Sequence, residues 1–94
     1  RAWDIIGDQP EVEVVLRFSP LVAARVQEAT WHPSQEVTQG PDGSLVWRAR
    51  VAGTYEIKLW ILGWGADVEV LAPPELRTEV SRTLAAALAH YGDA

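Results

Sequence analysis

Three arginines of this chain could form an anion-binding surface. Arg17 belongs to the run Glu11–Phe18, and Arg48 and Arg50 belong to the run Leu45–Val51. Both runs alternate apolar and polar residues with the period of a β-strand that has one buried face. If the large apolar side chains point toward the buried face of the sheet, the three guanidinium groups lie together on the opposite face. The spacing therefore predicts a site for an oligonucleotide or another anionic ligand.

Two further side chains belong to this predicted site. Trp31 and His32 stand in the motif W-H-P-S, in a loop that leads into the strand following it. An aromatic ring and an imidazole beside arginines are typical of contacts to nucleic acid. The alternative is a purely structural one, in which each arginine pairs with a carboxylate on a neighbouring strand, such as Glu13 or Glu69.

Catalytic chemistry has little support in this sequence. His32 and His90 lie far apart in the chain, and cysteine is absent, so a zinc site would need carboxylates recruited from several elements. The motif G-W-G-A at Gly63–Ala66 matches no phosphate-binding loop, and no serine lies in a nucleophile elbow. We therefore expect no enzyme activity, no metal and no cofactor.

Composition favours contacts with protein over contacts with nucleic acid. The net charge of -5 argues against a broad phosphate-binding surface, which requires clustered lysine and arginine. The 5 tryptophans in 94 residues exceed ordinary usage. Tryptophan fills cores, but it is also enriched at interfaces. We predict that Trp3, Trp47 and Trp64 contact another chain or domain.

The absence of cysteine also bears on location and origin. Without disulfides, a signal peptide or a membrane-spanning apolar run, the chain is expected to be cytoplasmic, with no membrane partner. It starts at Arg1 and contains no methionine, so we expect it to be part of a longer protein. Residues 1–10 are predicted to be a linker or arm from an upstream domain, and residues 11–94 a single folded domain.

Periodicity and turn residues divide that domain into seven elements. The predicted strands are Glu11–Phe18, Gln35–Gln39, Leu45–Val51 and Val68–Leu71. The predicted helices begin at Ser19-Pro20, Thr54 and Pro73-Pro74, and they end near Ala29, Leu62 and Tyr91. Ser19 is expected to cap the first helix with its side-chain oxygen, and Gly63 and Gly65 are expected to end the second in left-handed geometry.

This order, β-α-β-β-α-β followed by a helix, defines the fold class. It is α+β, the split βαβ or ferredoxin-like plan, with an antiparallel four-stranded sheet in the order 4-1-3-2 and a C-terminal helix added. The second helix is apolar around most of its circumference, and the last helix carries the stripe Leu76, Val80, Leu84, Leu88 and Tyr91. The second helix must lie across the sheet or bury its outer face against a partner. The sheet face that the first two helices leave bare is normally covered by another chain or by a neighbouring domain.

Five blocks of the sequence resemble one known family. They are V-L-R-F-S-P at Val15–Pro20, W-H-P-S-Q at Trp31–Gln35, P-D-G-S-L at Pro41–Leu45, W-I-L-G-W-G at Trp60–Gly65 and V-E-V-L-A-P-P-E-L-R at Val68–Arg77. Together they resemble the WCX domain, the C-terminal extension of bacterial WYL-domain transcriptional regulators. The resemblance covers about Glu11 to Tyr91. It differs in the helix after Pro20, which is more basic in the family than it is here.

The resemblance implies a function in assembly. The parent protein would carry an N-terminal helix-turn-helix that binds DNA and a central WYL domain that senses a ligand, nucleic acid in some cases. The WCX domain would form a homodimer, pack against the WYL domain and couple effector sensing to DNA binding. DNA would be contacted only through the helix-turn-helix. The alternative function is an effector-binding module in which Arg17, Arg48 and Arg50, with Trp31 and His32, contact an oligonucleotide or another anion.

Overall fold

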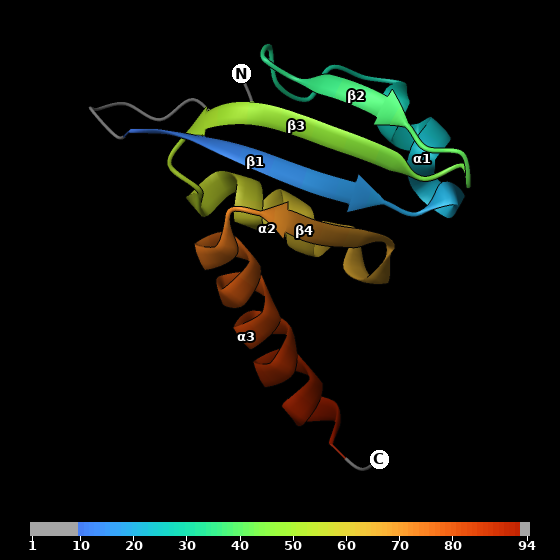
Figure 1. The fold of residues 1–94 in the computed structure, drawn as a ribbon. Helices are drawn as coiled ribbons and strands as arrows, with labels where there is room; N and C mark the ends of the chain where they lie inside the picture. The colour runs from blue at the N-terminus through green and yellow to red at the C-terminus, as the bar shows by residue number, and fades with distance from the viewer. Residues whose placement is uncertain (1–9, 93–94) are drawn as a thin grey trace.

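Alternating side chains place two long strands at the centre of the sheet. The computed structural model describes residues 10–92, in which β1 (Glu11–Phe18) pairs with β3 (Leu45–Ala52) along its whole length. The shorter strands β2 (Glu36–Gln39) and β4 (Val68–Ala72) add to the two edges, and all pairs are antiparallel. The order β2-β3-β1-β4 confirms the predicted split βαβ arrangement (Figure 1).

Three helices complete the domain. The first two, α1 (Pro20–Gln27) and α2 (Tyr55–Gly63), pack on one face of the sheet. The third, α3 (Pro74–Tyr91), follows β4 and extends away from the sheet (Figure 1). A short 3₁₀ turn, η1 (Gly65–Asp67), joins α2 to β4. Within residues 10–92, no helix combines the length and the apolar character needed to cross a membrane.

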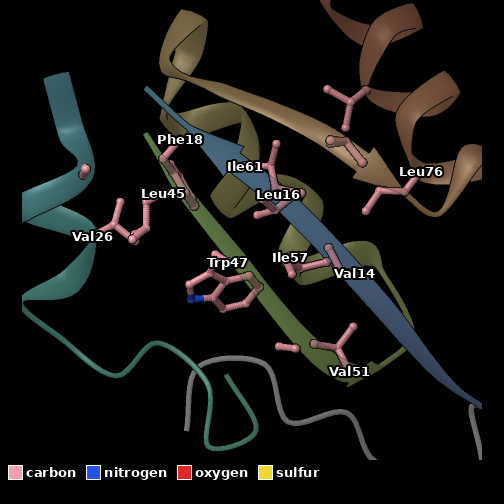
Figure 2. Close-up of a cluster of buried hydrophobic side chains, with 14 residues drawn as sticks. Val14, Leu16, Phe18, Val26, Leu45, Trp47, Val51, Ile57, Ile61 and Leu76 are labelled. Atoms are coloured by element: carbon pink, nitrogen blue, oxygen red, sulfur yellow. The ribbon is translucent and has the colours of Figure 1, made fainter. Parts of the chain in front are cut away.

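The core lies between the sheet and α1 and α2. The register sets Leu16 of β1 opposite Trp47 of β3 and Phe18 opposite Leu45, so their side chains share the helix-covered face. Figure 2 shows Leu16 and Val14 next to Ile57 and Ile61 of α2. The fully buried core residues of β1, β3, α1 and α2 include Val14, Leu16, Phe18, Val26, Leu45, Trp47, Val51, Ile57 and Ile61. The predicted inward faces of β1 and β3 are confirmed.

The boundaries of α1 differ from the prediction. The helix ends at Gln27 instead of near Ala29. Ser19 occupies the N-cap position, yet its side chain makes no capping hydrogen bond. Its Oγ donates instead to Asp67 Oδ1 at 2.9 Å, and its backbone N–H donates to the Asp67 carbonyl at 3.0 Å. Ser19 therefore joins the end of β1 to the turn before β4, a long-range contact that local sequence cannot reveal.

The two glycines after α2 differ in backbone geometry. Gly65 has φ of +61°, in the left-handed region, whereas Gly63 is the last residue of the helix and has no positive φ. The expectation that both glycines are left-handed is therefore wrong for Gly63. A Cβ atom at either position would meet no atom within 4 Å. An alanine at Gly65 would therefore be strained by its backbone conformation alone, without a clash against neighbouring atoms.

This difference predicts opposite effects of one substitution. Gly63→Ala should stabilise the fold by about 0.5 kcal/mol, because alanine loses less backbone entropy in a helix. Gly65→Ala should destabilise it by about 1 kcal/mol, because a Cβ atom strains the left-handed conformation. Urea denaturation followed by circular dichroism measures both values. Equal effects of the two substitutions would contradict the assigned geometry.

Candidate functional site

The sheet face opposite the helices carries the predicted arginines. Arg17 Nη2 lies 2.7 Å from Glu69 Oε1, and Arg77 Nη1 of α3 lies 2.9 Å from the other oxygen of the same carboxylate. Arg17 and Glu69 are directly opposed in the pairing of β1 with β4. Arg77 also donates to the Val70 carbonyl at 2.8 Å. The guanidinium of Arg17 is thus matched by a carboxylate within the chain.

The other two arginines have diagonal partners. Arg48 Nη1 lies 4.0 Å from Glu13 Oε2, and Arg50 Nε lies 3.5 Å from Glu11 Oε1. In the register, Arg48 opposes Val15 and Arg50 opposes Glu13, so each arginine reaches the carboxylate two residues toward the start of β1. The predicted alternative, cross-strand pairing with carboxylates, is therefore what the structure contains. All these side chains stay half-exposed, so each pair is worth no more than about 1 kcal/mol.

The charge of Glu69 responds to its two arginines. Hydrogen bonds from Arg77 and then Arg17 hold the pKa of the Glu69 carboxyl below its ordinary value of 4.5. A carboxyl whose pKa is lower in the folded state than in the unfolded state stabilises the fold at pH values above its unfolded-state pKa. That stabilisation is lost as the pH falls through the folded value.

We expect Glu69→Gln to lower the free energy of unfolding at neutral pH by less than about 1 kcal/mol, since the pair is exposed. Well below pH 4.5, where Glu69 itself becomes protonated, the variant should approach the parent chain in stability. Glu36→Gln is the matched control, because residues 10–92 offer Glu36 no ion pair on the same sheet face. A constant difference between Glu69→Gln and the parent chain at all pH values would contradict this linkage.

Trp31 and His32 lie in the loop between α1 and β2, and Gln35 holds this loop together. Gln35 Oε1 accepts hydrogen bonds from the backbone N–H of Trp31 at 2.7 Å, from that of His32 at 3.2 Å and from Trp47 Nε1 at 3.2 Å. The backbone N–H of Gln35 donates to the His32 carbonyl at 3.1 Å within the loop, and β2 begins at Glu36 and not at Gln35 as predicted. Gln35 was not recognised in the sequence, because its partners become neighbours only after β3 is in place.

The predicted ligand site does not assemble as a unit. His32 Nδ1 lies 2.9 Å from Ser34 Oγ, which also accepts a hydrogen bond from the Arg50 backbone N–H at 2.9 Å. The ring of Trp31, however, packs against Trp60 and Trp64 of the helical layer. The arginines lie on the opposite face of the sheet. The five predicted residues therefore occupy two sides of the domain.

The tryptophans instead form one cluster with Phe18. Ring centroids lie 5.1 Å apart for Trp47 and Trp60, 5.3 Å for Trp31 and Trp60, and 5.4 Å for Phe18 and Trp64. Edge-to-face and tilted geometries of this kind add to the stabilisation from buried area. The cluster fills the space between β3, α2 and the loop before β2.

The three tryptophans predicted to lie at an interface differ in where the structure places them. Trp47 is 0% exposed and belongs to the core. Its position on the inward face of β3 decides this. Trp64 is only partly buried and remains a candidate. Trp3 lies outside the described residues.

One side of the cluster borders an open depression. Arg25, Trp31, Leu59, Trp60, Gly63 and Trp64 line a groove of about 380 Å³, here called the tryptophan groove. Arg25 carries the only charge among these lining residues, and Leu59 is 53% exposed. The surface is thus mainly apolar and aromatic, the composition of a protein-binding site.

A second apolar surface lies on α3. Leu76 and Val80 are buried at 2% and 8% exposure, whereas Leu84, Leu88 and Tyr91 are exposed at 45%, 68% and 74%. These last three residues, here called the α3 ridge, continue the same helical stripe toward the C-terminal end of α3. The predicted stripe is present, and the domain itself covers only its first half.

The described part of the chain contains no cluster of three or more histidine, cysteine, aspartate or glutamate residues able to hold a metal ion. Asp42 is engaged in a turn, where hydrogen bonds from the Ser44 side chain and backbone lower the pKa of its carboxyl.

Comparison with known proteins assigns the domain. The profile of the WCX domain matches residues 10–88. Protein PafC from two strains of Mycobacterium tuberculosis, CDC 1551 / Oshkosh and ATCC 25618 / H37Rv, is 36% identical over an alignment of 89 residues that covers 90% of this chain. The chain spans 26% of the length of these relatives. With the α+β fold in place and the matching profile covering β1 to most of α3, the chain belongs to the WCX domain family.

Proposed function

We propose that this WCX domain is a non-catalytic assembly module of a longer transcriptional regulator. It holds two copies of that regulator together, and it packs against a neighbouring WYL domain to couple effector sensing to DNA binding. DNA is contacted by an N-terminal helix-turn-helix of the parent. The family assignment and the 36% identity to a protein about four times as long support this role within a larger chain.

The α3 ridge is the observation that carries this proposal. Leucine and tyrosine side chains in the C-terminal half of an 18-residue helix are left 45–74% exposed. Exposed apolar area of this kind is stabilised by removal from water, at about 25 cal/mol per Å². Contiguous apolar surface on a small domain marks a binding surface.

Neutral charge also favours self-association at this place. The segment from Thr83 to Tyr91 contains no aspartate, glutamate, lysine or arginine, although the whole chain has a net charge of -5. Two identical copies of an acidic domain repel each other over most of their surfaces. An isologous contact, in which the same surfaces meet, is therefore best placed on an uncharged segment.

Sedimentation equilibrium of the 94-residue chain over a wide range of concentrations tests the assembly role. We expect a reversible monomer–dimer equilibrium, which should be tighter in the parent regulator because other domains add contact area. A strictly monomeric chain that also fails to bind its WYL domain would refute the proposal. If the chain stays monomeric but binds the WYL domain, the proposed coupling role stands and the proposed dimer is wrong.

Binding of an anionic effector by the arginines is the second function that the sequence predicted. The contacts of the described residues do not favour it, because Arg17, Arg48 and Arg50 each have a carboxylate partner within the chain. Binding a phosphate there would require breaking these pairs and would bring the ligand close to Glu11, Glu13 and Glu69. We therefore do not propose the sheet face as an effector site.

A further inference from the structure

The tryptophan groove and the α3 ridge are complementary surfaces that cannot meet within one chain. The lining residues of the groove come from α1, from α2 with the residue after it, and from the loop before β2. The start of α3 is fixed by the burial of Leu76 and Val80 and by the pair of Lys58 Nζ with Glu79 Oε2 at 3.1 Å. From there the helix runs away from the sheet and from α1 (Figure 1). A ridge that enters this groove must come from another molecule.

We propose that the α3 ridge of one copy lies in the tryptophan groove of a second copy, and that the second copy returns the same contact. This inference rests on the proposed dimer and specifies which surfaces form it. A twofold axis that places one ridge in one groove places the other pair as well. Each copy then contributes two patches, the ridge and the groove.

The chemistry of the two surfaces matches. Leu84 and Leu88 present branched apolar side chains, and Trp31, Trp60 and Trp64 present aromatic surface that residues 10–92 leave partly open. The C-terminus of a helix carries a partial negative charge from its free carbonyl groups. Arg25, at the groove, supplies a cation for that end of the partner's α3. The contact therefore pairs apolar with apolar surface and the groove's one charge with an opposite partial charge.

The size of the contact also favours the exchange. Stable dimers bury at least about 1,200 Å² in total. The groove and the ridge of each copy both carry apolar side chains that the fold buries only in part. Direct pairing of α3 with α3 would cover one ridge per copy and would leave both grooves open. The reciprocal exchange adds the aromatic surface of both grooves to the surface of both ridges.

The absence of cysteine allows a direct test by cross-linking. Leu59→Cys places a thiol at the groove, and Leu84→Cys or Leu88→Cys places one on the ridge, all at exposed positions. Two single variants, one of each kind, are mixed and treated with a short bismaleimide. We expect cross-linked dimers in the mixtures and few or none when any single variant is treated alone. Efficient cross-linking of Leu88→Cys alone would overturn the proposal in favour of α3 pairing with α3.

Filling the groove provides a second, independent measurement. A side chain at Gly63 would point into open space within the free chain, so Gly63→Leu should fold normally while occupying part of the groove. We expect the dimer dissociation constant to rise about tenfold or more, the effect of losing one well-packed apolar contact. Unchanged dimerisation of Gly63→Leu would overturn the exchange but leave the proposed dimer intact. If the chain never dimerises, both the exchange and the proposed dimer are wrong.

Discussion

Trp47→Ala should leave the domain close to unfolding. The indole is fully buried in the centre of β3 and contacts the ring of Trp60 at a centroid distance of 5.1 Å. Replacing a buried tryptophan by alanine costs about 3–5 kcal/mol, from lost apolar burial and from the cavity that remains. The variant also removes one of the three donors to Gln35 Oε1. For a domain of this size the thermal midpoint should fall by about 15 °C or more.

Trp64→Ala is the matched control for this prediction. Trp64 belongs to the same cluster, with a centroid distance of 5.4 Å to Phe18, but it lies at the rim and is only partly buried. We expect it to cost roughly half as much as Trp47→Ala, because solvent already reaches the ring and a smaller cavity forms. Urea denaturation compares the two variants. Equal losses of stability in the two variants would contradict the placement of Trp47 in the core and Trp64 at the rim.

Local patterns were sufficient to predict the fold. The alternation in β1 and β3 has a period of two, so once one residue is assigned to the core, every other residue on the strand follows. Pro20 and Pro74 mark helix starts, and α3 ends at Tyr91 as predicted, followed by Gly92 with φ of +54°. These signals act within a few residues of one another. These signals can therefore be recognised in the sequence without the structure.

The interacting surfaces were harder to predict because they depend on contacts between distant residues. Tryptophan suits a core and an interface equally well, so residue type could not separate Trp47 from Trp64. Their different burial follows from their positions on β3 and at the C-terminal end of α2. The diagonal pairs of Arg48 and Arg50 depend on the register between β1 and β3, which no local pattern specifies.

The double substitution Leu84→Glu and Leu88→Glu should abolish dimerisation without unfolding the domain. Both side chains are exposed, at 45% and 68%, so surface substitutions there should change the free energy of unfolding of the monomer by no more than about 0.5 kcal/mol. In the proposed dimer, however, the two glutamates would be buried in a mainly apolar groove whose lining residues offer one cation, Arg25. At least one carboxylate per groove is then left without a partner, which costs several kcal/mol. We expect the dissociation constant to rise at least about 100-fold, measured by sedimentation equilibrium.

Leu21→Glu is the control that makes this prediction specific. Leu21 of α1 is 84% exposed, more than either leucine of the α3 ridge, and it lies in neither the ridge nor the tryptophan groove. The gain of one negative charge per chain there, half that of the double variant, should leave the dimer nearly unchanged. If Leu21→Glu weakened the dimer as much as the double variant, general charge repulsion would explain the effect. If neither variant weakened it, the two copies would meet through another surface, and the apolar half of α3 would remain to be covered by a neighbouring domain.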